Sequence, residues 1–432
     1  GLIDEYNLDQ PFPLQPVILS DEEEKKYYRG FANETLWPLF HDLLGNAVFD
    51  LESWEVYKEV NRKFAEEIRT AMRPGDYIWI HDYQLILVGA HLRRLGVRRP
   101  IAFFQHIPFP ALDLFRRLPW KQELIEAMMR YDLIGFQTLQ DRRNFKQCVA
   151  SLLPDVSSTI HRRYTMLYYK NRRVKVGNYP ISIDFEAFDS GARSAAVRKA
   201  AAELRSDYRA PKLILGLDRL DYTKGIPERF LAFERFLEKY PRFRHKVSLI
   251  QVVVPSRTRV QRYRELKERL DSLTGRINGR FSERGWVPIH YFFKHLKRTQ
   301  LLAHYRACDV ALVTPLRDGM NLVAKEYCAA KVKLDGVLIL SEFAGAALQL
   351  SKGAVLVNPY DLNGTADALH RALIMDETER IHRMRVLRYQ IRRNDVHRWV
   401  QWFLDAFRSM LRERNRAKEP LETPLEANVR SA

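Results

Sequence analysis

Short runs of aliphatic, β-branched and aromatic residues alternate along the chain with longer segments in which apolar residues recur every three or four positions. The short runs predict strands, and the longer segments predict amphipathic helices. In the first half, the predicted helices are Trp54–Met72 and Lys121–Arg130, and the predicted strands are Tyr77–His81, Ile101–Gln105, Leu133–Gln137 and Arg173–Gly177. Such alternation is typical of parallel sheets that are covered by helices on both faces.

A second series of the same kind begins near Asp189, where small and polar residues predict a linker that leads into a helix. Its helices include Pro227–Lys239, and its predicted strands are Lys212–Gly216, Val247–Val254, Val310–Val313, Val337–Leu340 and Ala354–Val357. The fold class is therefore predicted as α/β, with two Rossmann-like domains that face a central cleft. Ligands are expected at the carboxyl ends of the strands.

The same pattern predicts the domain boundaries. Residues 1–188 form the first domain and residues 189–385 the second, while residues 386–414 form C-terminal helices that pack back on the first domain. The helix expected over 395–414 has apolar residues at helical spacing that are predicted to be core: Trp399, Trp402, Phe403, Phe407 and Leu411. The tail, residues 415–432, is polar and contains prolines, so we expect it to be loosely ordered.

Composition narrows the class of protein. The chain has 432 residues, more than a single core usually supports, and 46% of them are hydrophobic, which excludes a disordered chain. The net charge of +18 raises the question of nucleic-acid binding. However, the basic residues are spread over helical segments such as 259–269 and 383–393, which is typical of solvated helix faces, and no recognition motif accompanies them. Phosphorylated substrates account for part of the excess, and no nucleic-acid partner is predicted.

The cysteines and the apolar runs bear on location. Cys148, Cys308 and Cys328 stand far apart and lack the spacing of a zinc site, which favours a reducing, cytoplasmic compartment. Apolar runs such as Leu85–Ala90 are far shorter than the ~20 residues that a membrane helix needs, so no membrane span is predicted.

The most informative cluster of polar residues follows the first strand of the second domain, at 218–225. Here Arg219 and Lys224 lie five positions apart on a loop that leads into a helix. A guanidinium and an ammonium group in that place are able to clamp a diphosphate and neutralise it as it leaves. The alternative is that these two cations pair with Asp218 and Asp221 on a surface loop.

A second cluster, at 314–326, also follows a strand and opens a helix. Gly319 allows the backbone to approach a ligand, and the free N–H groups at a helix start favour an anion. Glu326 lies about two turns further on, near the side of Asp318, where its carboxylate is able to accept two ribose hydroxyls. An isolated Arg-Asp-Gly is also common in surface turns, so this cluster gains weight only together with the first.

Further polar residues end strands elsewhere. Asp82 and His106 follow two strands of the first domain, where each is able to hydrogen-bond sugar hydroxyls. The alternatives are a helix cap for Asp82 and a structural histidine beside prolines for His106. Arg257 follows the strand that ends at Val254 and offers another cation for a phosphate.

Several common catalytic motifs are missing from the sequence. There is no Gly-x-Gly-x-x-Gly, no Walker loop, no metal-ligand trio and no nucleophilic Ser or Cys with a base at a recognisable spacing. These absences argue against dehydrogenases, kinases and hydrolases. The remaining set of cations, carboxylates and a histidine suits group transfer from an activated phosphate donor.

In these residues the chain resembles the trehalose-6-phosphate synthases, a family of retaining, metal-independent glucosyltransferases with two Rossmann-like domains of the GT-B type. The similarity extends from Gly30 to about Phe407. The motifs that carry it are Gly30–Pro38, Trp79–Tyr83, His106–Pro110, Gly135–Gln137, Arg219–Gly225, Thr274–Gly279, Arg317–Glu326 and Ser341–Ala346. Several long motifs in the same order make a chance agreement implausible.

The resemblance implies a role for each candidate residue. Arg219 and Lys224 hold the donor diphosphate, and Glu326 binds the ribose. The donor glucose is held by Asp318, Gly319, the backbone of Met320, Asn321 and Leu322, and His106. Asp82 contacts the acceptor hydroxyls and Arg257 the acceptor phosphate. The family reacts on one face of the sugar without a protein nucleophile, a metal or a cofactor, and the leaving phosphate helps to take the acceptor proton.

Two features depart from the family pattern. Members begin with a strand, a glycine-rich loop and a second strand, which supply an arginine and backbone groups near both substrates, and these do not precede Gly1. Either an N-terminal portion precedes this sequence, which is the expectation, or the site lacks those groups. In addition, Asp42 stands where some members place a tyrosine that contacts the acceptor.

The predicted function is transfer of glucose from a nucleoside-diphosphate glucose, UDP-glucose first, to glucose 6-phosphate, which gives trehalose 6-phosphate. One alternative is a glucosylglycerol-phosphate synthase that uses glycerol 3-phosphate. Another is a catalytically weak regulatory homologue. The sequence leaves the nucleobase, the acceptor and a homo-oligomeric state open.

Overall fold

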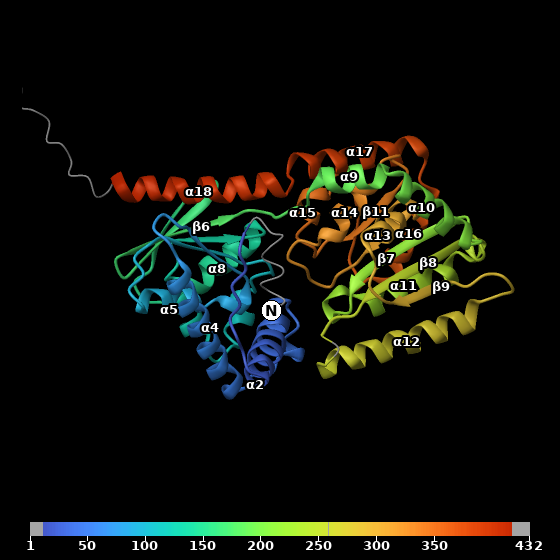
Figure 1. Ribbon diagram of the computed structural model, residues 1–432. Coiled ribbons are helices and arrows are strands. Elements are labelled where there is room, and N and C mark those ends of the chain that lie inside the picture. Colours follow the sequence, from blue (N-terminus) through green and yellow to red (C-terminus); the bar gives the residue numbers. More distant parts are fainter. Residues whose placement is uncertain (1–11, 258, 417–432) are drawn as a thin grey trace, which may run out of the picture.

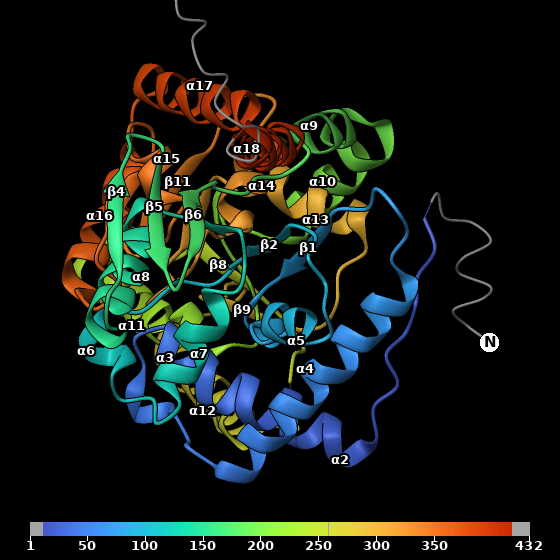
Figure 2. The same ribbon diagram turned by 90° about the vertical axis from the view of Figure 1, so that its left-hand side faces the viewer.

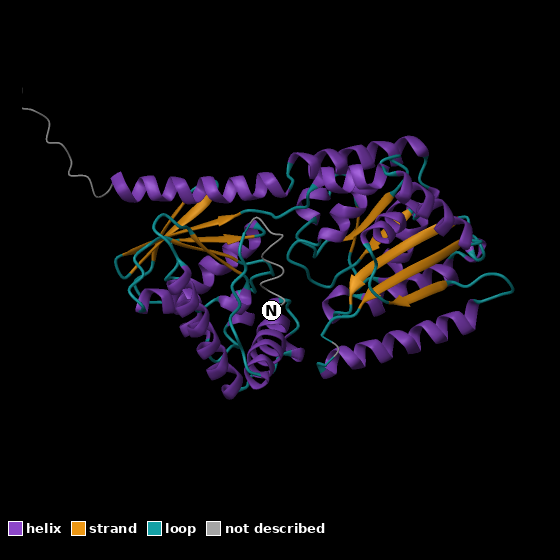
Figure 3. Ribbon diagram, viewed as in Figure 1, coloured by secondary structure: helices purple, strands orange, loops and turns teal. Residues whose placement is uncertain are grey.

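Each predicted series of strands forms most of one six-stranded sheet in the computed structural model, which describes residues 12–257 and 259–416. In the second sheet, the strand Ile289–Phe293 was not predicted. The two sheets lie in separate halves of the molecule (Figure 1). The parallel strands of both sheets point toward the boundary between the halves (Figure 3). The predicted α/β fold with two Rossmann-like domains is confirmed.

The first sheet has the strand order β1-β2-β3-β6-β5-β4. Its strands are β1 (Ile78–His81), β2 (Ile101–Phe104), β3 (Leu133–Phe136), β4 (Ser157–Ile160), β5 (Tyr164–Tyr169) and β6 (Arg172–Asn178). The four predicted strands β1, β2, β3 and β6 are parallel, whereas β5 and β4 add an antiparallel hairpin at the edge. This hairpin was not predicted.

The second sheet is entirely parallel, with the order β12-β11-β10-β7-β8-β9. Its strands are β7 (Lys212–Arg219), β8 (Val247–Val254), β9 (Ile289–Phe293), β10 (Val310–Val313), β11 (Val337–Ser341) and β12 (Val355–Val357). Numbered within the domain, this is the common doubly wound order 3-2-1-4-5-6. The strand order therefore reverses between β7 and β10, and ligands of such sheets bind at that point.

Helices cover both sheets. Those of the first domain are α2 (Asp21–Glu23), the π-type helix η1 (Glu24–Leu36), α3 (Trp37–Phe40), η2 (Leu44–Asn46), α4 (Leu51–Ala71), η3 (Tyr83–Leu85), α5 (Val88–Arg94), α6 (Leu112–Phe115), α7 (Lys121–Met128) and α8 (Leu139–Leu152). The remainder are α9 (Phe185–Arg193), α10 (Ala195–Asp207), η4 (Tyr222–Lys224), α11 (Ile226–Lys239), η5 (Pro241–Phe243), α12 (Gln261–Phe281), α13 (Arg298–Ala307), α14 (Leu322–Ala330), α15 (Ala347–Leu350), α16 (Leu362–Ile374), α17 (Glu377–Arg393) and α18 (Val396–Arg416).

The linker predicted at Asp189 is wrong, because this residue lies inside α9. Asp184 caps the helix by accepting a hydrogen bond from the Ala187 backbone N–H. The Asp189 carboxylate is held by Arg193, one turn further along, and by Arg388 of α17. These ion pairs keep a segment of small and polar residues helical.

Helix α18 lies across the first sheet and packs Trp399, Phe403, Phe407 and Met410 against buried residues of β2 and β3 (Figure 1). The prediction that Trp402 is core is wrong, since 37% of it is exposed. Trp402 falls beside the buried stripe of the helix, where the Arg398 guanidinium lies 4.6 Å from its ring centroid. Of the predicted tail, residues 415–416 belong to α18, and residues 417–432 lie outside the described residues.

Candidate active site

The two predicted phosphate-directed clusters meet at the reversal of strand order in the second sheet. The first follows β7 and forms η4, and the second follows β10 and leads into α14. Gly225 has a φ of 61°, in the left-handed region. A Cβ at this position would lie 2.3 Å from the Thr314 carbonyl oxygen, so only glycine allows the two loops to approach this closely.

Lys224 and Asp318 form an ion pair between these loops. The Lys224 Nζ lies 2.5 Å from Asp318 Oδ2, and the side chains are only 13% and 11% exposed. Burial disfavours the charge on Lys224, but Asp318 and Asp221 outweigh it and raise the pKa of the ammonium group. Burial likewise opposes the charge on Asp318, yet Lys224 holds the pKa of that carboxyl below its usual value. Both groups are therefore charged at neutral pH.

Asp318 also shapes the start of α14. Its Oδ1 accepts hydrogen bonds from the backbone N–H groups of Met320 and Asn321, at 3.2 and 3.1 Å. The Asn321 side chain in turn caps α14 by accepting from the Ala324 N–H. Leu322 is the first residue of this helix. One carboxylate thus fixes both the lysine and the loop that leads into the helix.

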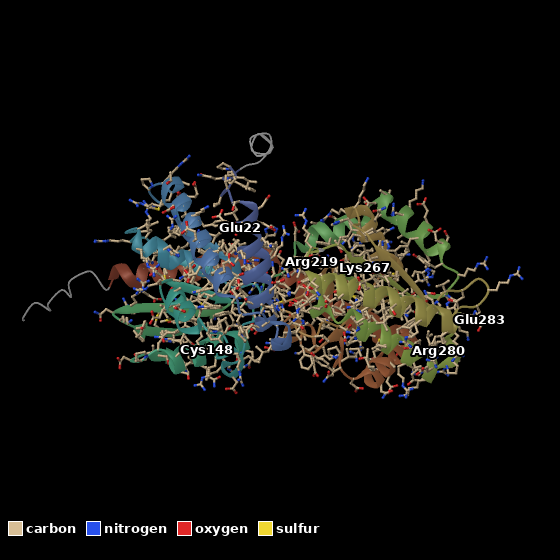
Figure 4. The ribbon with its side chains drawn as sticks, turned by 90° about the horizontal axis from the view of Figure 1, so that it is seen from below. Glu22, Cys148, Arg219, Lys267, Arg280 and Glu283 are labelled. Carbon is tan, nitrogen blue, oxygen red and sulfur yellow. The ribbon has the colours of Figure 1, made fainter. Side chains whose placement is uncertain are left out.

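Arg219 lies nearer to solvent. Its side chain is 51% exposed, and its Nη2 is 4.0 Å from Asp221 Oδ2. Figure 4 places it at the boundary between the two halves of the molecule. The alternative pairing with acidic neighbours in the same loop thus applies loosely to Arg219 but is wrong for Lys224. Asp218 is engaged elsewhere, in a buried ion pair with Arg229.

Glu326 lies in α14 and is held by a neighbouring helix. Its Oε2 accepts a hydrogen bond of 2.7 Å from the Tyr305 hydroxyl of α13. Burial raises the pKa of the Glu326 carboxyl, although Tyr305 works against this shift. The carboxylate is thereby held in one position by a neutral donor.

The first domain contributes Asp82 and His106. Asp82 has a φ of 71° and does not cap η3. Instead, its Oδ1 accepts a hydrogen bond of 3.1 Å from the His106 backbone N–H. The helix-cap alternative is therefore wrong. Burial raises the pKa of Asp82 to about 6.

The imidazole of His106 lies against that of His81, with 3.0 Å between His106 Nε2 and His81 Nδ1. Burial, helped by His81, lowers the pKa of His106 to about 4. Both histidines are thus neutral at pH 7, since burial lowers the pKa of His81 too. A neutral imidazole offers one donor and one acceptor, which suits hydroxyl groups better than anions.

The two domains touch at Gly319. A Cβ at this position would lie 2.3 Å from the His106 carbonyl oxygen, so the close approach requires glycine. The contact brings the loop before α14 against the loop after β2. Gly319, one of the predicted donor residues, therefore lies directly against His106 of the first domain.

Arg257 stands in an aromatic cage. Its Nη1 donates to the Tyr263 hydroxyl at 2.7 Å, and its Nη2 donates to the Tyr83 hydroxyl of the first domain at 3.1 Å. Its guanidinium lies 4.2 Å from the ring centroid of Trp37. Burial works against the charge of Arg257, but the tyrosines and Asp221 keep its pKa above the ordinary value. The group is a fixed cation at the boundary between the domains.

Trp37, Tyr83 and Tyr263 were not predicted as site residues. Trp37 also lies 5.9 Å from Arg219, measured from the ring centroid to Cζ, and so connects both cations of this boundary. Trp37 and Tyr83 fall within motifs that carry the resemblance, which is a usable signal. Tyr263 lies in the first turn of α12, only six positions after Arg257, but no motif in the sequence marks it.

Asp42 forms an ion pair with Arg317 across the domain boundary, with 3.3 Å between Asp42 Oδ2 and Arg317 Nε. Burial raises the pKa of Asp42, and Arg317 opposes the shift. The residue has a φ of 61°. The position that departs from the family pattern therefore connects the two domains.

Neither a metal-binding cluster nor a membrane-spanning helix occurs among the described residues. Within residues 12–257 and 259–416, no group of three or more His, Cys, Asp or Glu side chains is arranged to hold a metal ion. In the same part of the chain, no helix combines the length and the apolar character needed to cross a membrane.

The chain matches glycosyltransferase family 20 over residues 4–409. It is 44% identical over 403 residues to a trehalose-6-phosphate synthase of Mycobacterium sp. (strain KMS), covering 92% of this chain and 82% of the relative. It is 42% identical over 418 residues to a bifunctional trehalose-6-phosphate synthase/phosphatase of Thermoproteus tenax. That match covers 96% of this chain but only 56% of the relative's length.

Solved structures have the same fold. An alpha,alpha-trehalose-phosphate synthase (UDP-forming) from Burkholderia xenovorans, in complex with glucose-6-phosphate, superposes with a TM-score of 0.87 and 40% identity. The superposition covers 90% of this chain and 86% of the other. Sequence and structure thus agree over most of the chain.

Proposed function

Because the chain belongs to glycosyltransferase family 20, we propose that it transfers glucose from UDP-glucose to glucose 6-phosphate, forming trehalose 6-phosphate and UDP. The Burkholderia relative is UDP-forming and binds glucose-6-phosphate. A synthase that makes trehalose phosphate from that acceptor and releases UDP takes the second glucose from UDP-glucose. We propose the same reaction, with the same substrates and products, for this chain.

The observation that carries the proposal is the Lys224–Asp318 pair at the reversal of strand order, with Arg219 beside it. In the proposed reaction, an acceptor hydroxyl oxygen bonds to C1 of the donor glucose as the bond from C1 to the diphosphate oxygen breaks. The acceptor proton passes to the departing phosphate on the same face of the sugar. Lys224 and Arg219 stabilise the negative charge that develops on this group.

The donor is proposed to bind along the second domain. Glu326, held by Tyr305, accepts hydrogen bonds from the ribose hydroxyls. The N-terminus of α14, which begins at Leu322, faces the diphosphate and adds partial positive charge. Asp318 acts on the reaction through Lys224 and through the loop that it folds, while Gly319 and the backbone from Met320 to Leu322 adjoin the donor glucose.

The acceptor is proposed to bind between Asp82 and Arg257. Arg257 is a permanent cation suited to the phosphate of glucose 6-phosphate. Asp82 accepts hydrogen bonds from sugar hydroxyls, and neutral His106 contacts the transferred glucose. Because Arg257 carries a permanent positive charge while Asp82 and His106 form hydrogen bonds, the acceptor is oriented with its phosphate toward Arg257.

We also propose that the reaction needs no metal, because Lys224 and Arg219 offer two positive charges that would neutralise the diphosphate in place of a divalent cation. A reducing, cytoplasmic compartment is proposed as well, supported by three buried free cysteines, Cys148, Cys308 and Cys328.

Glucose 6-phosphate is favoured over glycerol 3-phosphate as acceptor, because both relatives described above are named trehalose-6-phosphate synthases, one of them bifunctional. A regulatory homologue is disfavoured, because both cations of the donor side are present.

The test is a panel of three donors, UDP-, GDP- and ADP-glucose, each with glucose 6-phosphate or glycerol 3-phosphate and with EDTA present. The readout is nucleoside diphosphate released by the purified full chain. The proposal expects the fastest release from UDP-glucose with glucose 6-phosphate, and trehalose 6-phosphate as product. Release that requires glycerol 3-phosphate, or no release with any pair, contradicts it.

A further inference from the structure

A cavity of about 900 Å³ opens on the first domain, away from the site described above. It is lined by residues of α8 and of the β4–β5 hairpin, which are labelled together in Figure 2. Because β5 runs antiparallel to β6, the turn at residues 161–163 lies beyond the carboxyl end of β6. The cavity therefore opens at the same edge of the sheet as the boundary between the domains.

The ionisable side chains that line this cavity are all basic. Its lining includes Arg142, Arg143 and Lys146 of α8 and His161 and Arg162 of the hairpin turn, and no Asp or Glu is part of it. In the described part of the chain, none of these cations makes a side-chain ion pair or hydrogen bond. Elsewhere on this basic protein, surface arginines commonly have carboxylate partners, as Arg62 has Glu59 and Glu66.

Arg142 is the decisive residue. It is only 6% exposed, and its Nη1 is buried without a hydrogen-bond partner. Burial, together with the neighbouring charge of Arg143, lowers the pKa of the Arg142 guanidinium below its usual value. A buried guanidinium without a partner costs free energy, and a bound anion would remove that cost.

The rim of the cavity is partly apolar. Leu139 is 36% exposed and Ile160 is 65% exposed, and both belong to the lining. A volume of this order is typical of sites for small molecules. Cations at the base with exposed aliphatic side chains beside them suit a phosphate group attached to a carbon skeleton.

We propose that this cavity is a second anion site, which binds a small phosphate-bearing molecule through Arg142, Arg143 and Lys146. Arg142 supplies the buried contact, whereas Arg143 and Lys146 hold the ligand from the rim. The site is separate from the donor and acceptor positions, since none of the residues assigned to these lines the cavity. Thr138, one turn before Arg142, lies close to Gly345 of the second domain, so an occupied site would adjoin the domain boundary.

Calorimetric titration with inorganic pyrophosphate tests the proposal. No other phosphate compound is present, because UDP or glucose 6-phosphate would compete with pyrophosphate for the cavity. The variants Lys224→Met and Arg257→Gln identify any pyrophosphate bound at the donor or acceptor position. The wild-type protein is expected to bind pyrophosphate saturably, and the variant Arg143→Gln/Lys146→Gln at least tenfold more weakly. The control Arg94→Gln/Lys199→Gln removes the same charge from exposed positions outside the cavity and is expected to bind within twofold of the wild type.

A second arm distinguishes inorganic from organic ligands. Equal affinity for phosphate and phenyl phosphate would assign the site to inorganic anions, and tighter binding of phenyl phosphate would assign it to organic phosphates. Both results support the site. Absence of saturable binding, or equal weakening in the control variant, overturns the proposal.

Two further variants distinguish a loss of binding to the cavity from a loss of folding and from a failure of the proposed reaction. Arg142→Gln is expected to abolish pyrophosphate binding. If this variant does not fold, the result for Arg143→Gln/Lys146→Gln alone decides whether the cavity binds the anion. Lys224→Met, which disrupts the donor position, is expected to retain pyrophosphate binding at the cavity. Loss of binding in Lys224→Met would show that the pyrophosphate occupied the donor position, which contradicts a second site.

Discussion

The two sides of the domain boundary differ in the charge state of their buried ionisable groups. On the second domain, Lys224 and Asp318 are buried together and both stay charged, with Arg219 exposed beside them. On the first domain, burial shifts the groups toward their neutral forms: the pKa of Asp82 is raised to about 6 and that of His106 is lowered to about 4. One side is built from paired ions and the other from weakly charged hydrogen-bonding groups.

This difference matches what each side would contact in the proposed reaction. A departing diphosphate gains charge, and fixed cations stabilise such charge best when they are already in place. Sugar hydroxyls carry no charge and need donors and acceptors in fixed positions. Arg257 belongs to the second domain but donates to Tyr83 of the first, and the proposed phosphorylated acceptor would account for a permanent cation at this place. The predictions below test this division, from the largest expected effect to the smallest.

Lys224→Met should have the largest effect. We expect kcat to fall by roughly 10³-fold, because the charge nearest to the leaving group is lost. The free energy of unfolding should also fall, by about 3 kcal/mol, because Asp318 is left buried without its partner. Steady-state kinetics and urea denaturation measure the two effects. A variant with near wild-type kcat would show that the cations of the second domain do not serve catalysis.

Arg219→Gln should lower kcat by about 10²-fold and leave stability almost unchanged. The reason is that this side chain is half exposed and its nearest carboxylate is 4.0 Å away. The matched control is Arg269→Gln, which removes a similarly exposed arginine that lies 3.6 Å from Glu228. If both variants lose activity equally, net charge rather than position is responsible.

Arg257→Lys should raise the KM for glucose 6-phosphate by roughly 10-fold or more, with little change in the KM for UDP-glucose. Lysine keeps the charge but loses the two directed hydrogen bonds to Tyr263 and Tyr83. Initial rates at varied acceptor concentration provide the measurement. An equal rise in both KM values would place Arg257 outside the acceptor position.

Asp82→Asn should stabilise the protein at pH 8, by about 1–2 kcal/mol. Since the folded-state pKa of Asp82 is raised to about 6, the folded protein binds this proton more tightly than the unfolded chain does. Stability from Asp82 is therefore full below about pH 4 and is lost as the pH rises through 6. The advantage of the asparagine variant should shrink as the pH is lowered from 8 to 5 in urea denaturation. An advantage independent of pH would contradict the shifted pKa.

Asp42→Asn should have the smallest effect, within about 1 kcal/mol in stability. Its ion pair with Arg317 is long, at 3.3 Å, and Asp42 is 39% exposed. Thermal unfolding of this variant and of Arg317→Gln gives the comparison. A much larger loss in either would show that the pair holds the domains together.

The sequence predicted the buried strands well and the exposed ones poorly. β8 and β10 have the predicted bounds, because each is a continuous apolar run that is covered on both faces. β4 was missed because Ser157–Ile160 is exposed at every residue and has no apolar alternation. The linker at Asp189 was misassigned because its ion pairs, one with Arg193 in the same helix and one with the distant Arg388, keep that segment helical.

The sequence predicted which residues belong to the site, but it did not predict which of them contact one another. The sequence indicated Lys224 and Asp318 separately, yet their contact joins residues that are 94 positions apart and depends on the order of strands β7 and β10. The neutral state of His106 depends on burial beside His81, which spacing does not reveal. Tyr263 lies only six positions after Arg257, yet no motif in the sequence marks it as a partner of that arginine.

The most direct test of the account is the double variant Lys224→Met/Asp318→Asn. Removal of both charges leaves neither member of this ion pair buried without its partner, so the unfolding midpoint should return toward that of the wild type. Its kcat with UDP-glucose and glucose 6-phosphate should nevertheless remain at least about 10²-fold below the wild-type value. A stable double variant whose kcat recovers to within a few-fold of the wild type would contradict a catalytic role for the buried cation.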